Sequence, residues 1–347
     1  MEPVISYAQA SDGVNIAYWA LGKGPPVVFM PTTLSHIELE WRTGRGALYE
    51  RLAQHLRLVR YDGRGHGLSD RDPGDISLDA LMSDLDAVAD HQRLGRFAML
   101  AQSHAGPVAI AYAATRPERV SHLVLWHAYP RGSDFRQSTE VQTLLQLVDK
   151  DWELYSLTLA HSRAGWARSE DARELAGLLR ASVDPEFYKR RLQAELAWDS
   201  TALLSQVTAP TLVLHRRNFE GTDVKVSSFM ASQIPAARLS IVEGESNLLE
   251  AADDPAVVEI ERFLGVETEA APRVRQPWAR PLPQELTARE VETLRLLAMG
   301  RRNKEIASEL NLSIRTVESH VAAIYEKIGA HSRADAATYA IRSGLIP

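Results

Sequence analysis

The sequence predicts an α/β protein in which a doubly wound, mostly parallel sheet with a helical lid is followed by a small all-α domain. Short runs of β-branched and aliphatic residues alternate with helical stretches over residues 1–268, which is the pattern of a sheet covered by helices on both faces. Four prolines crowd residues 270–283 and indicate a connector. Beyond them, apolar residues recur every three or four positions, as they do in amphipathic helices.

The composition is that of a globular protein with more than one domain. Its 347 residues are 45% hydrophobic and 24% charged, which is enough to bury a sizeable core. The 0 cysteines exclude disulfides and thiolate metal sites. No run approaches the roughly 20 apolar residues of a membrane span, and residues 1–3 do not open a signal peptide. We therefore expect a cytoplasmic protein without a membrane partner, metal or cofactor.

The charge is unevenly distributed along the chain. The net charge is −6, but residues 284–347 contain 9 basic and 8 acidic side chains, for +1, which leaves 30 and 37 in residues 1–283, for −7. A net negative charge disfavours binding to nucleic acid. A DNA-binding function for the C-terminal part must therefore be argued from its pattern.

Buried strands and one helical insertion are expected in residues 1–268. The runs that predict strands, bounded by Gly, Pro and Asp, are Val27–Met30, Leu58–Tyr61, Phe97–Ala101, Leu123–Trp126, Leu212–Leu214 and Leu239–Val242. Residues 132–206 lack strand signals and are predicted to form the lid. The bulky residues of this lid are Trp152, Tyr155, Trp166, Phe187, Tyr188 and Trp198.

The segment from Leu100 to Gly106 reads Leu-Ala-Gln-Ser-His-Ala-Gly and follows a predicted strand. A nucleophile elbow needs small residues two before and two after its serine, and Ala101 and Ala105 supply them around Ser103. Together with the segments 62–69 (Asp-Gly-Arg-Gly-His-Gly-Leu-Ser) and 116–120 (Arg-Pro-Glu-Arg-Val), this elbow resembles the α/β-hydrolase fold over roughly residues 5–265.

The resemblance implies a nucleophile, an acid after a late strand and a histidine after the last strand. The acid position is occupied by Asn218-Phe219, and the histidine position by Asn247 in Gly-Glu-Ser-Asn. No histidine occurs between His215 and His320. A serine without an adjacent base is a weak nucleophile. We therefore expect a domain that is not an enzyme.

A pocket beneath the lid is still expected, and with it a small apolar ligand. The side chains and amides predicted to bind it are Ser103, His104, Thr32, Asn247, Trp152 and Trp166. The alternative is that Ser103 has no role in ligand binding and that the lid tryptophans form a core. His36, His104 and His127 are more typical of structural histidines. Displaced acids or solvated charges are the two interpretations of Asp134, Glu220 and Asp223.

Helix signals define the C-terminal domain, residues 284–347, after a linker at 269–283 whose Arg273, Arg275 and Arg280 are solvated or contact phosphate. The segment Thr287–Glu290 is a capping box, and Gly300 ends its helix. A second helix follows Asn303, and Ser313 caps a third. The expected inward residues are Leu294, Leu297, Ile306, Ala307, Leu310, Val317, Val321, Ile324 and Ile328. A last helix runs from about Ser332 toward Gly344.

Two short helices joined by a tight turn allow the second of them to enter a major groove. On this third helix of the domain, Arg315, Glu318, Ser319 and Ala322 face outward toward bases. The residues expected to meet phosphates are Lys304, Thr316, His320 and Lys327. The segments Leu-Thr-Ala-Arg-Glu, Asn-Lys-Glu-Ile-Ala and Thr-Val-Glu-Ser-His-Val resemble the LuxR/NarL-type helix-turn-helix family over about sixty residues.

That resemblance implies base reading by Glu318, Ser319 and Ala322, backbone contacts by Lys304, Thr316 and His320, and dimerisation through the last helix. Ala322 replaces a longer polar residue, which leaves a methyl contact to thymine. The leading hypothesis is a homodimeric transcription factor on a pseudo-palindromic operator, with a ligand-sensing hydrolase-like domain. The alternatives are an active esterase or lactonase with a DNA-binding tail, an N-terminal domain used only for docking, and a C-terminal bundle used for protein contact.

Overall fold

The computed structural model divides into two compact units, residues 1–268 (the first unit) and 269–347 (the second unit). The residues that the structure describes are 3–32, 35–135, 145–164, 169–219, 222–244, 249, 254–266, 288–298, 301, 303–310, 312–328 and 336. Within these ranges, no helix combines the length and apolarity needed to cross a membrane. The predicted linker and the predicted last helix, apart from residue 336, lie outside the described residues.

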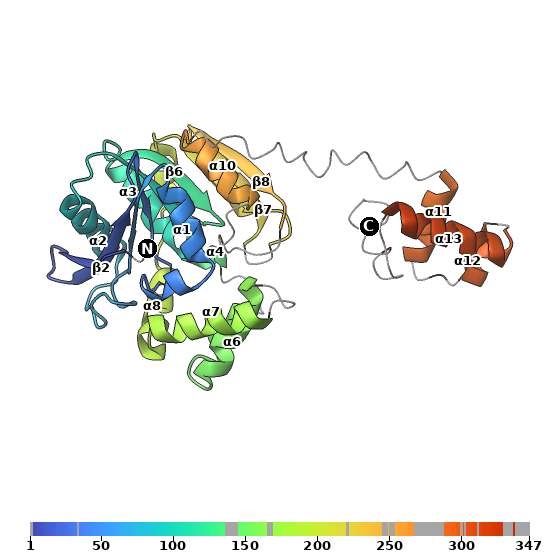
Figure 1. Cartoon of the computed structure of the whole chain (residues 1–347), viewed down its shortest axis with the longest axis horizontal. Helices are drawn as coiled ribbons and strands as arrows, with labels where there is room; N and C mark the ends of the chain where they lie inside the picture. Colours follow the sequence, from blue (N-terminus) through green and yellow to red (C-terminus); the bar gives the residue numbers. More distant parts are fainter. Residues whose placement is uncertain are drawn as a thin grey trace. The chain divides into compact units, whose positions relative to one another are not determined.

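A twisted sheet forms the centre of the first unit (Figure 1). In the described part of the chain it has eight strands in the order β1-β2-β4-β3-β5-β6-β7-β8. The strands are β1 (Ser6–Gln9), β2 (Asn15–Leu21), β3 (Pro26–Phe29), β4 (Arg57–Tyr61), β5 (Phe97–Gln102), β6 (Val120–Trp126), β7 (Thr211–Arg216) and β8 (Ala237–Val242). From β4 to β8 the neighbouring strands are parallel, whereas β1 and β2 pair antiparallel.

All six predicted strands are confirmed, as β3 to β8, and the doubly wound α/β class with them. The prediction that the last strand is buried is wrong. The β8 strand lies at the edge of the sheet, and Ile241 is 40% exposed. The predicted strands did not include the β1–β2 hairpin, which turns at Gly13 with a φ of +91°.

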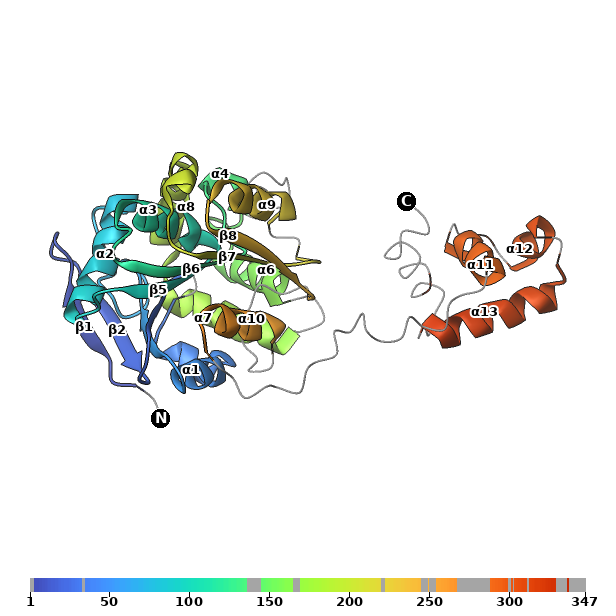
Figure 2. The same ribbon diagram turned by 90° about the horizontal axis from the view of Figure 1, so that it is seen from above.

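Helices cover both faces of this sheet (Figure 2). One core contains side chains of α2 (Leu78–His91), α3 (Gly106–Thr115) and α9 (Val224–Gln233). The core on the other face contains side chains of α1 (Arg45–Ala53) and α10 (Pro255–Phe263). The carboxyl ends of the parallel strands are therefore left to loops, which is where open α/β sheets bind ligands.

The described part of the predicted lid is mainly helical. It comprises α4 (Gly132–Phe135), α6 (Trp152–Ala164), α7 (Ser169–Ser182), α8 (Pro185–Leu196) and the 3-10 helix η3 (Thr201–Gln206). The α6, α7 and α8 helices share their own apolar core. In that core Tyr155 and Tyr188 join their hydroxyls at 2.8 Å. The lid is therefore a packed subdomain.

The α10 helix is fixed near both of its ends. Before its first turn, the Asp254 carboxylate pairs with the Arg216 guanidinium of β7. Near its last turn, Glu261 accepts two hydrogen bonds from Arg51 of α1, at 2.8 and 2.7 Å. Such bidentate pairs combine energy with fixed geometry. The last helix of the first unit is thus held to the sheet and to a neighbouring helix.

The second unit packs α11 (Ala288–Ala298), α12 (Asn303–Glu309) and α13 (Ile314–Ile328) around one apolar core. Four of the predicted inward positions are fully buried, since Leu294, Ile306, Val317 and Ile324 are each 0% exposed. Leu297 and Ala307 are buried as well, and Leu310 and Val321 are partly buried against the same core. The Ser313 hydroxyl accepts a hydrogen bond from the Thr316 amide at 3.1 Å, so the predicted cap of the third helix is also confirmed.

Candidate functional site

Ser103 stands on a strained turn between β5 and α3. Its φ is +47°, a left-handed value that is rare outside glycine, and the residue is 4% exposed. The neighbours allow this turn because Ala101 and Ala105 are small and buried. A Cβ on Gly106 would lie 2.5 Å from the Tyr129 carbonyl oxygen. The local geometry is that of a nucleophile elbow.

The catalytic partners of such a serine do not assemble around Ser103 in the described part of the chain. No hydrogen bond joins Ser103 to another described side chain. At the end of β7, Phe219 is 9% exposed and packs on the His127 ring at 4.2 Å. An apolar contact thus occupies the position at which the family resemblance implies an acid. Asn247, the predicted polar contact, lies outside the described residues.

The His104 imidazole is bound within the protein. Its Nδ1 lies 2.6 Å from the Tyr129 hydroxyl and 3.1 Å from the Glu195 carboxylate of α8. Arg191 completes this cluster, because its Nε donates to Glu195 at 3.2 Å and its guanidinium covers the Trp198 ring at 4.3 Å. The structural interpretation of His104 is therefore supported, and its role for a ligand reduces to the backbone amide. The cluster also ties the lid to the elbow.

A small cavity lies at the carboxyl ends of β3, β4 and β5, beside the elbow. Its lining includes Thr32, His66, Ala105 and Arg191. Its volume is about 20 Å³, which is room for about one water molecule. Among the predicted ligand residues Thr32 lines it, whereas Ser103, His104 and Trp152 are not part of this lining. Instead, Trp152 stacks on Tyr155 at 5.4 Å as part of the lid core. Trp166 lies outside the described residues.

His66 presents an unsatisfied nitrogen beside this cavity. Its Nδ1 lies 3.1 Å from the Arg64 carbonyl, so this nitrogen carries the proton and Nε2 is a free acceptor. Nε2 is buried and has no hydrogen-bond partner. Burial, together with the nearby Arg191 charge, lowers the pKa of His66 to about 3. Sequence reasoning missed His66 and Arg191 as site residues, although the segment 62–69, which contains His66, had been singled out as a family motif.

The predicted alternative acids have structural roles where they are described. Asp134 pairs with Arg131 at 2.8 Å. Asp223 caps α9, since its carboxylate accepts from the Lys225 amide at 2.9 Å. Glu220 lies outside the described residues. His36 is a buried histidine whose pKa is lowered by burial. None of these described groups supplies an acid to Ser103.

The outward face of α13 carries the predicted base-reading residues. Arg315, Glu318, Ser319 and Ala322 are exposed, and Val317 on the opposite face is fully buried. Of the predicted phosphate contacts, Lys304 and Thr316 are exposed and His320 is partly exposed. The helix thus presents polar side chains in the phase that major-groove reading requires.

Lys327 differs from the other predicted phosphate contacts. Its ammonium lies 2.8 Å from both carboxylate oxygens of Glu290, which is 5% exposed. Glu290 was predicted to serve the capping box with Thr287, which lies outside the described residues. An ammonium held by a buried carboxylate has little left to offer a phosphate. The amphipathic pattern did not reveal this partner on another helix.

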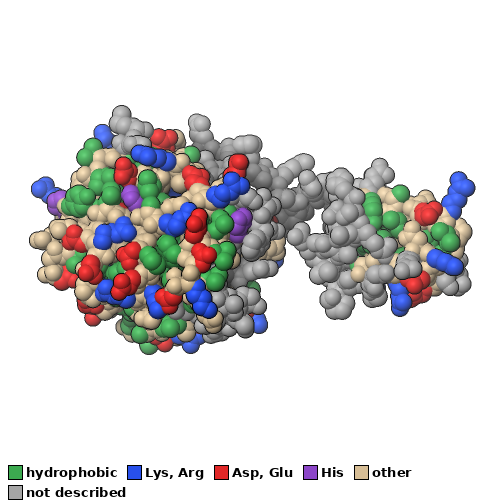
Figure 3. All heavy atoms as spheres, turned by 90° about the horizontal axis from the view of Figure 1, so that it is seen from below, with side chains coloured by type: hydrophobic (Ala, Val, Ile, Leu, Met, Phe, Trp, Pro, Cys, Tyr) green, Lys and Arg blue, Asp and Glu red, His purple; other side chains and the backbone are tan. Residues whose placement is uncertain are grey.

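The surface of the first unit gives no sign of a nucleic-acid interface on the face that Figure 3 shows. Basic and acidic side chains are interspersed over it. A DNA-binding surface gathers positive charge. On this face the first unit therefore lacks the charge pattern of a DNA contact.

Comparison with protein families decides the assignment of both units. Residues 25–215 match the family model "alpha/beta hydrolase fold". The chain belongs to the α/β hydrolase fold family. Residues 284–340 match the model "Bacterial regulatory proteins, luxR family", whose helix-turn-helix domains bind DNA. The chain is therefore a DNA-binding LuxR-type regulator fused to a hydrolase-like domain.

Individual relatives agree with this division. A pimeloyl-[acyl-carrier protein] methyl ester esterase of Nitrosomonas europaea is 31% identical over 228 residues, which cover 63% of this chain and 86% of the esterase. The transcriptional regulatory protein LiaR of Bacillus subtilis is 44% identical over 75 residues, 21% of this chain and 36% of LiaR. A hydrolase from Pseudomonas aeruginosa superposes with a TM-score of 0.65 at 23% identity, covering 75% of this chain and 98% of its own. That likeness shows the fold alone.

Proposed function

We propose that the first unit senses a small ligand without catalysing a reaction, and that its occupancy controls DNA binding by the second unit. The observation that carries the proposal is the absence of any histidine between His215 and His320 in the sequence. In this fold the general base follows the last strand. With no imidazole on that segment, Ser103 has no base at the family's position to take its proton.

The surroundings of Ser103 support a binding role. The strained turn is retained at a φ of +47°, although such backbone costs about 1–3 kcal/mol. The acid position is filled by Phe219, which packs on His127. What remains at the elbow is a fixed polar group at the carboxyl edge of a parallel sheet, where ligands of this architecture bind.

The ligand site that we propose is the cavity lined by Thr32, His66 and Arg191. Met30, Leu81 and Val108 give it an apolar wall, and Tyr61 and Asp84, whose carboxylate pairs with Arg64, add polar lining. A ligand would therefore be amphipathic. The volume of about 20 Å³ is too small for such a molecule. Binding would therefore require α8, which carries Arg191, to move.

Movement of α8 would link the ligand to the elbow, because Glu195 and Arg191 on this helix hold His104 and Trp198. A ligand shifts a two-state protein only by the difference of its affinities for the two states. A homodimer on a pseudo-palindromic operator would amplify such a shift, because both half-sites respond together.

The test uses the full chain and DNA from the promoter region of its own gene. Fluorescence anisotropy would measure DNA affinity before and after addition of small amphipathic esters and lactones, together with product formation from each. The proposal expects a change of at least fivefold in DNA affinity for one compound, without turnover. Arg191→Gln should abolish that response while basal DNA affinity persists. Turnover of the same compound, or a response that Arg191→Gln leaves intact, would contradict it.

An active esterase is the second candidate function, and two observations favour it. The Nitrosomonas europaea relative at 31% identity is named an esterase, and the serine elbow keeps its strained geometry. This candidate predicts hydrolysis of p-nitrophenyl acetate that Ser103→Ala abolishes. If the wild-type rate equals that of Ser103→Ala, the esterase hypothesis is rejected and the sensing proposal stands.

A further inference from the structure

A large apolar side chain is exposed at the beginning of α13. Ile314 is the first residue of this helix and is 46% exposed. Among the described residues of the second unit, it is the only large apolar side chain exposed to this degree. It belongs neither to the core that contains Val317 and Ile324 nor to the partly buried residues packed against that core. The packing of the second unit therefore gives no reason for an isoleucine at this position.

Ile314 begins a stripe of exposed residues along α13. Residues four apart lie one above the other on a helix, so Ile314 is followed on its side by Glu318 and then by Ala322, which are both exposed. Helical side chains also tilt toward the N-terminus of their helix. The Ile314 side chain therefore extends this stripe of predicted base-reading residues at the N-terminal end of the helix.

The first turn of α13 is held by the cap that precedes Ile314. The Ser313 hydroxyl accepts from the Thr316 amide at 3.1 Å and lies 2.8 Å from the Thr316 hydroxyl. The Ser313 carbonyl accepts from the Val317 amide at 3.1 Å. Isoleucine is β-branched, which restricts its first side-chain torsion in a helix. Ile314 is thus largely ordered before it meets a partner, and little entropy is lost when it binds.

The chemistry of isoleucine restricts what it can contact on a DNA duplex. Phosphate oxygens accept hydrogen bonds and attract cations, and the Ile314 side chain offers neither a donor nor a charge. In the major groove, the apolar group on the base edges is the C5 methyl of thymine. The N-terminal residues of the second helix in a helix-turn-helix are those that contact base edges. An exposed isoleucine at this end of α13 therefore fits a thymine methyl group.

We propose that Ile314 is a specificity-determining residue, which selects thymine by packing on its C5 methyl group in the major groove. From Ile314 to Glu318 the helix rises by about 6 Å, and base pairs are about 3.4 Å apart. The thymine should therefore lie within about two base pairs of the base that Glu318 meets. This inference rests on DNA binding by the second unit, and it is independent of sensing or catalysis by the first.

The test begins with selection of duplexes from a random library by the full chain and by its Ile314→Ala variant. Wild-type protein should enrich thymine at one position of each half-site. Ile314→Ala should lose this preference and keep those at other positions, because alanine favours a helix more than isoleucine does. Leu154→Ala is the matched control, since it truncates an apolar lid residue that is 48% exposed. It should select the same sequence as wild type.

Deoxyuridine in place of that thymine, in one half-site, removes the methyl group alone. Wild-type protein should bind the substituted duplex about fourfold more weakly, which is the worth of one buried methyl group. Ile314→Ala should bind the two duplexes equally. The slope of log affinity against log salt should be the same for both proteins, because Ile314 makes no phosphate contact. Fluorescence anisotropy would measure these affinities, and circular dichroism would show that each variant folds.

Loss of methyl discrimination in Ile314→Ala, but not in Leu154→Ala, supports the proposal. The proposal is overturned if wild-type protein binds thymine and deoxyuridine duplexes equally at every thymine of the half-site. It is also overturned if Ile314→Ala weakens binding to selected and random duplexes alike, since Ile314 would then act through the helix or the DNA backbone. A variant that selects and binds DNA as wild type does would overturn it and assign Ile314 to a protein partner.

Discussion

The two units place their polar side chains in opposite ways. In the second unit, the side chains predicted to read DNA, such as Arg315 and Glu318, point to solvent from a helix whose other face is the core. In the first unit the polar groups near the candidate site are buried and paired, as Glu40, Arg60 and His104 show. Side chains on an exposed face can be substituted, and the function that they serve changed, without loss of the protein's stability. Buried polar groups contribute to the site and to the fold together.

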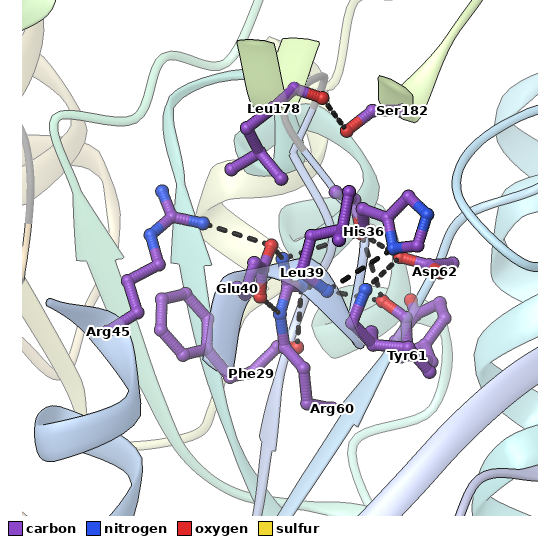
Figure 4. A network of polar contacts seen from close by, with 12 residues as sticks. Phe29, His36, Leu39, Glu40, Arg45, Arg60, Tyr61, Asp62, Leu178 and Ser182 are labelled. Carbon is purple, nitrogen blue, oxygen red and sulfur yellow. Dashed lines mark hydrogen bonds and ion pairs between the residues drawn. The ribbon is translucent and has the colours of Figure 1, made fainter. Parts of the chain in front are cut away.

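The largest expected effect tests whether the buried network is as structural as this contrast implies. Glu40→Gln removes the charge that Arg60 and Arg45 face at 2.7 and 3.0 Å (Figure 4). Breaking a buried ion pair costs about 3–5 kcal/mol. We expect urea unfolding of the first unit to show a loss of this size. The exposed neighbour Glu38 is the matched control, and Glu38→Gln should change stability by less than about 0.5 kcal/mol. Equal effects would erase the contrast.

The next effect concerns Lys327, which is an exception to the exposed pattern of the second unit. Lys327→Met leaves the 5% exposed Glu290 without its ammonium partner. Loss of a hydrogen bond to a buried charged group costs about 1–3 kcal/mol. Hydrogen exchange of the α11 and α13 amides in the full chain should accelerate accordingly. Lys304→Met should leave this exchange unchanged. A phosphate contact as the main role of Lys327 would instead appear as unchanged exchange and weaker DNA binding.

A pH effect of intermediate size should appear in the first unit. Burial, with a smaller contribution from His215, lowers the pKa of His127 to about 2, while its Nε2 accepts from the Arg216 amide at 3.3 Å. The folded pKa lies below the unfolded value of about 6.5. The stability that the neutral ring contributes is thus present above pH 6.5 and lost as the pH falls toward 2.

His127→Gln keeps an acceptor but cannot be protonated. The difference in unfolding free energy between wild type and variant should therefore change by about 1.4 kcal/mol per pH unit below pH 6.5. Urea unfolding at pH 7.5, 6.5 and 5.5 would measure it. A constant difference over this range would mean that His127 titrates normally, and hence that the ring is less enclosed than the structure describes.

The smallest effect belongs to Lys304, which is exposed at the start of α12. Lys304→Ala removes one phosphate contact, so the slope of log affinity against log salt should fall in magnitude by about one. DNA affinity measured at several salt concentrations would show this change for specific and random duplexes alike. Loss confined to the specific duplex would instead assign Lys304 to base recognition.

The sequence was enough to predict the described helices of the second unit and their exposed face, because one periodic pattern of apolar residues indicates both. The spacing that buries Val317 and Ile324 also fixes which side chains face outward. The same reasoning did not predict the ion pair of Lys327, whose partner Glu290 lies 37 residues away on another helix. Helical periodicity describes a face, and it carries no information about what the neighbouring helix presents to it.

In the first unit the sequence predicted the central strands and the serine elbow, because buried runs and a small-residue turn are local patterns. It missed the β1–β2 hairpin at the edge of the sheet, where short strands carry little periodicity. It also missed Arg191 and the packing of Trp19 of β2 on Trp41, whose ring centroids lie 5.4 Å apart. Both arise where segments distant in the chain meet. Such meetings depend on strand order, which a single sequence does not specify.

The two ion pairs of α10 bear on how force could pass along the chain. Asp254 fastens the beginning of this helix to Arg216, and Glu261 fastens its final turns to Arg51. Force applied to the chain beyond residue 266 would therefore act first on α10, a helix held at both of its ends, before it reached the sheet. The hydrolase-like unit should resist unfolding from its C-terminal side. A conformational change transmitted through α10 would displace this helix as a whole.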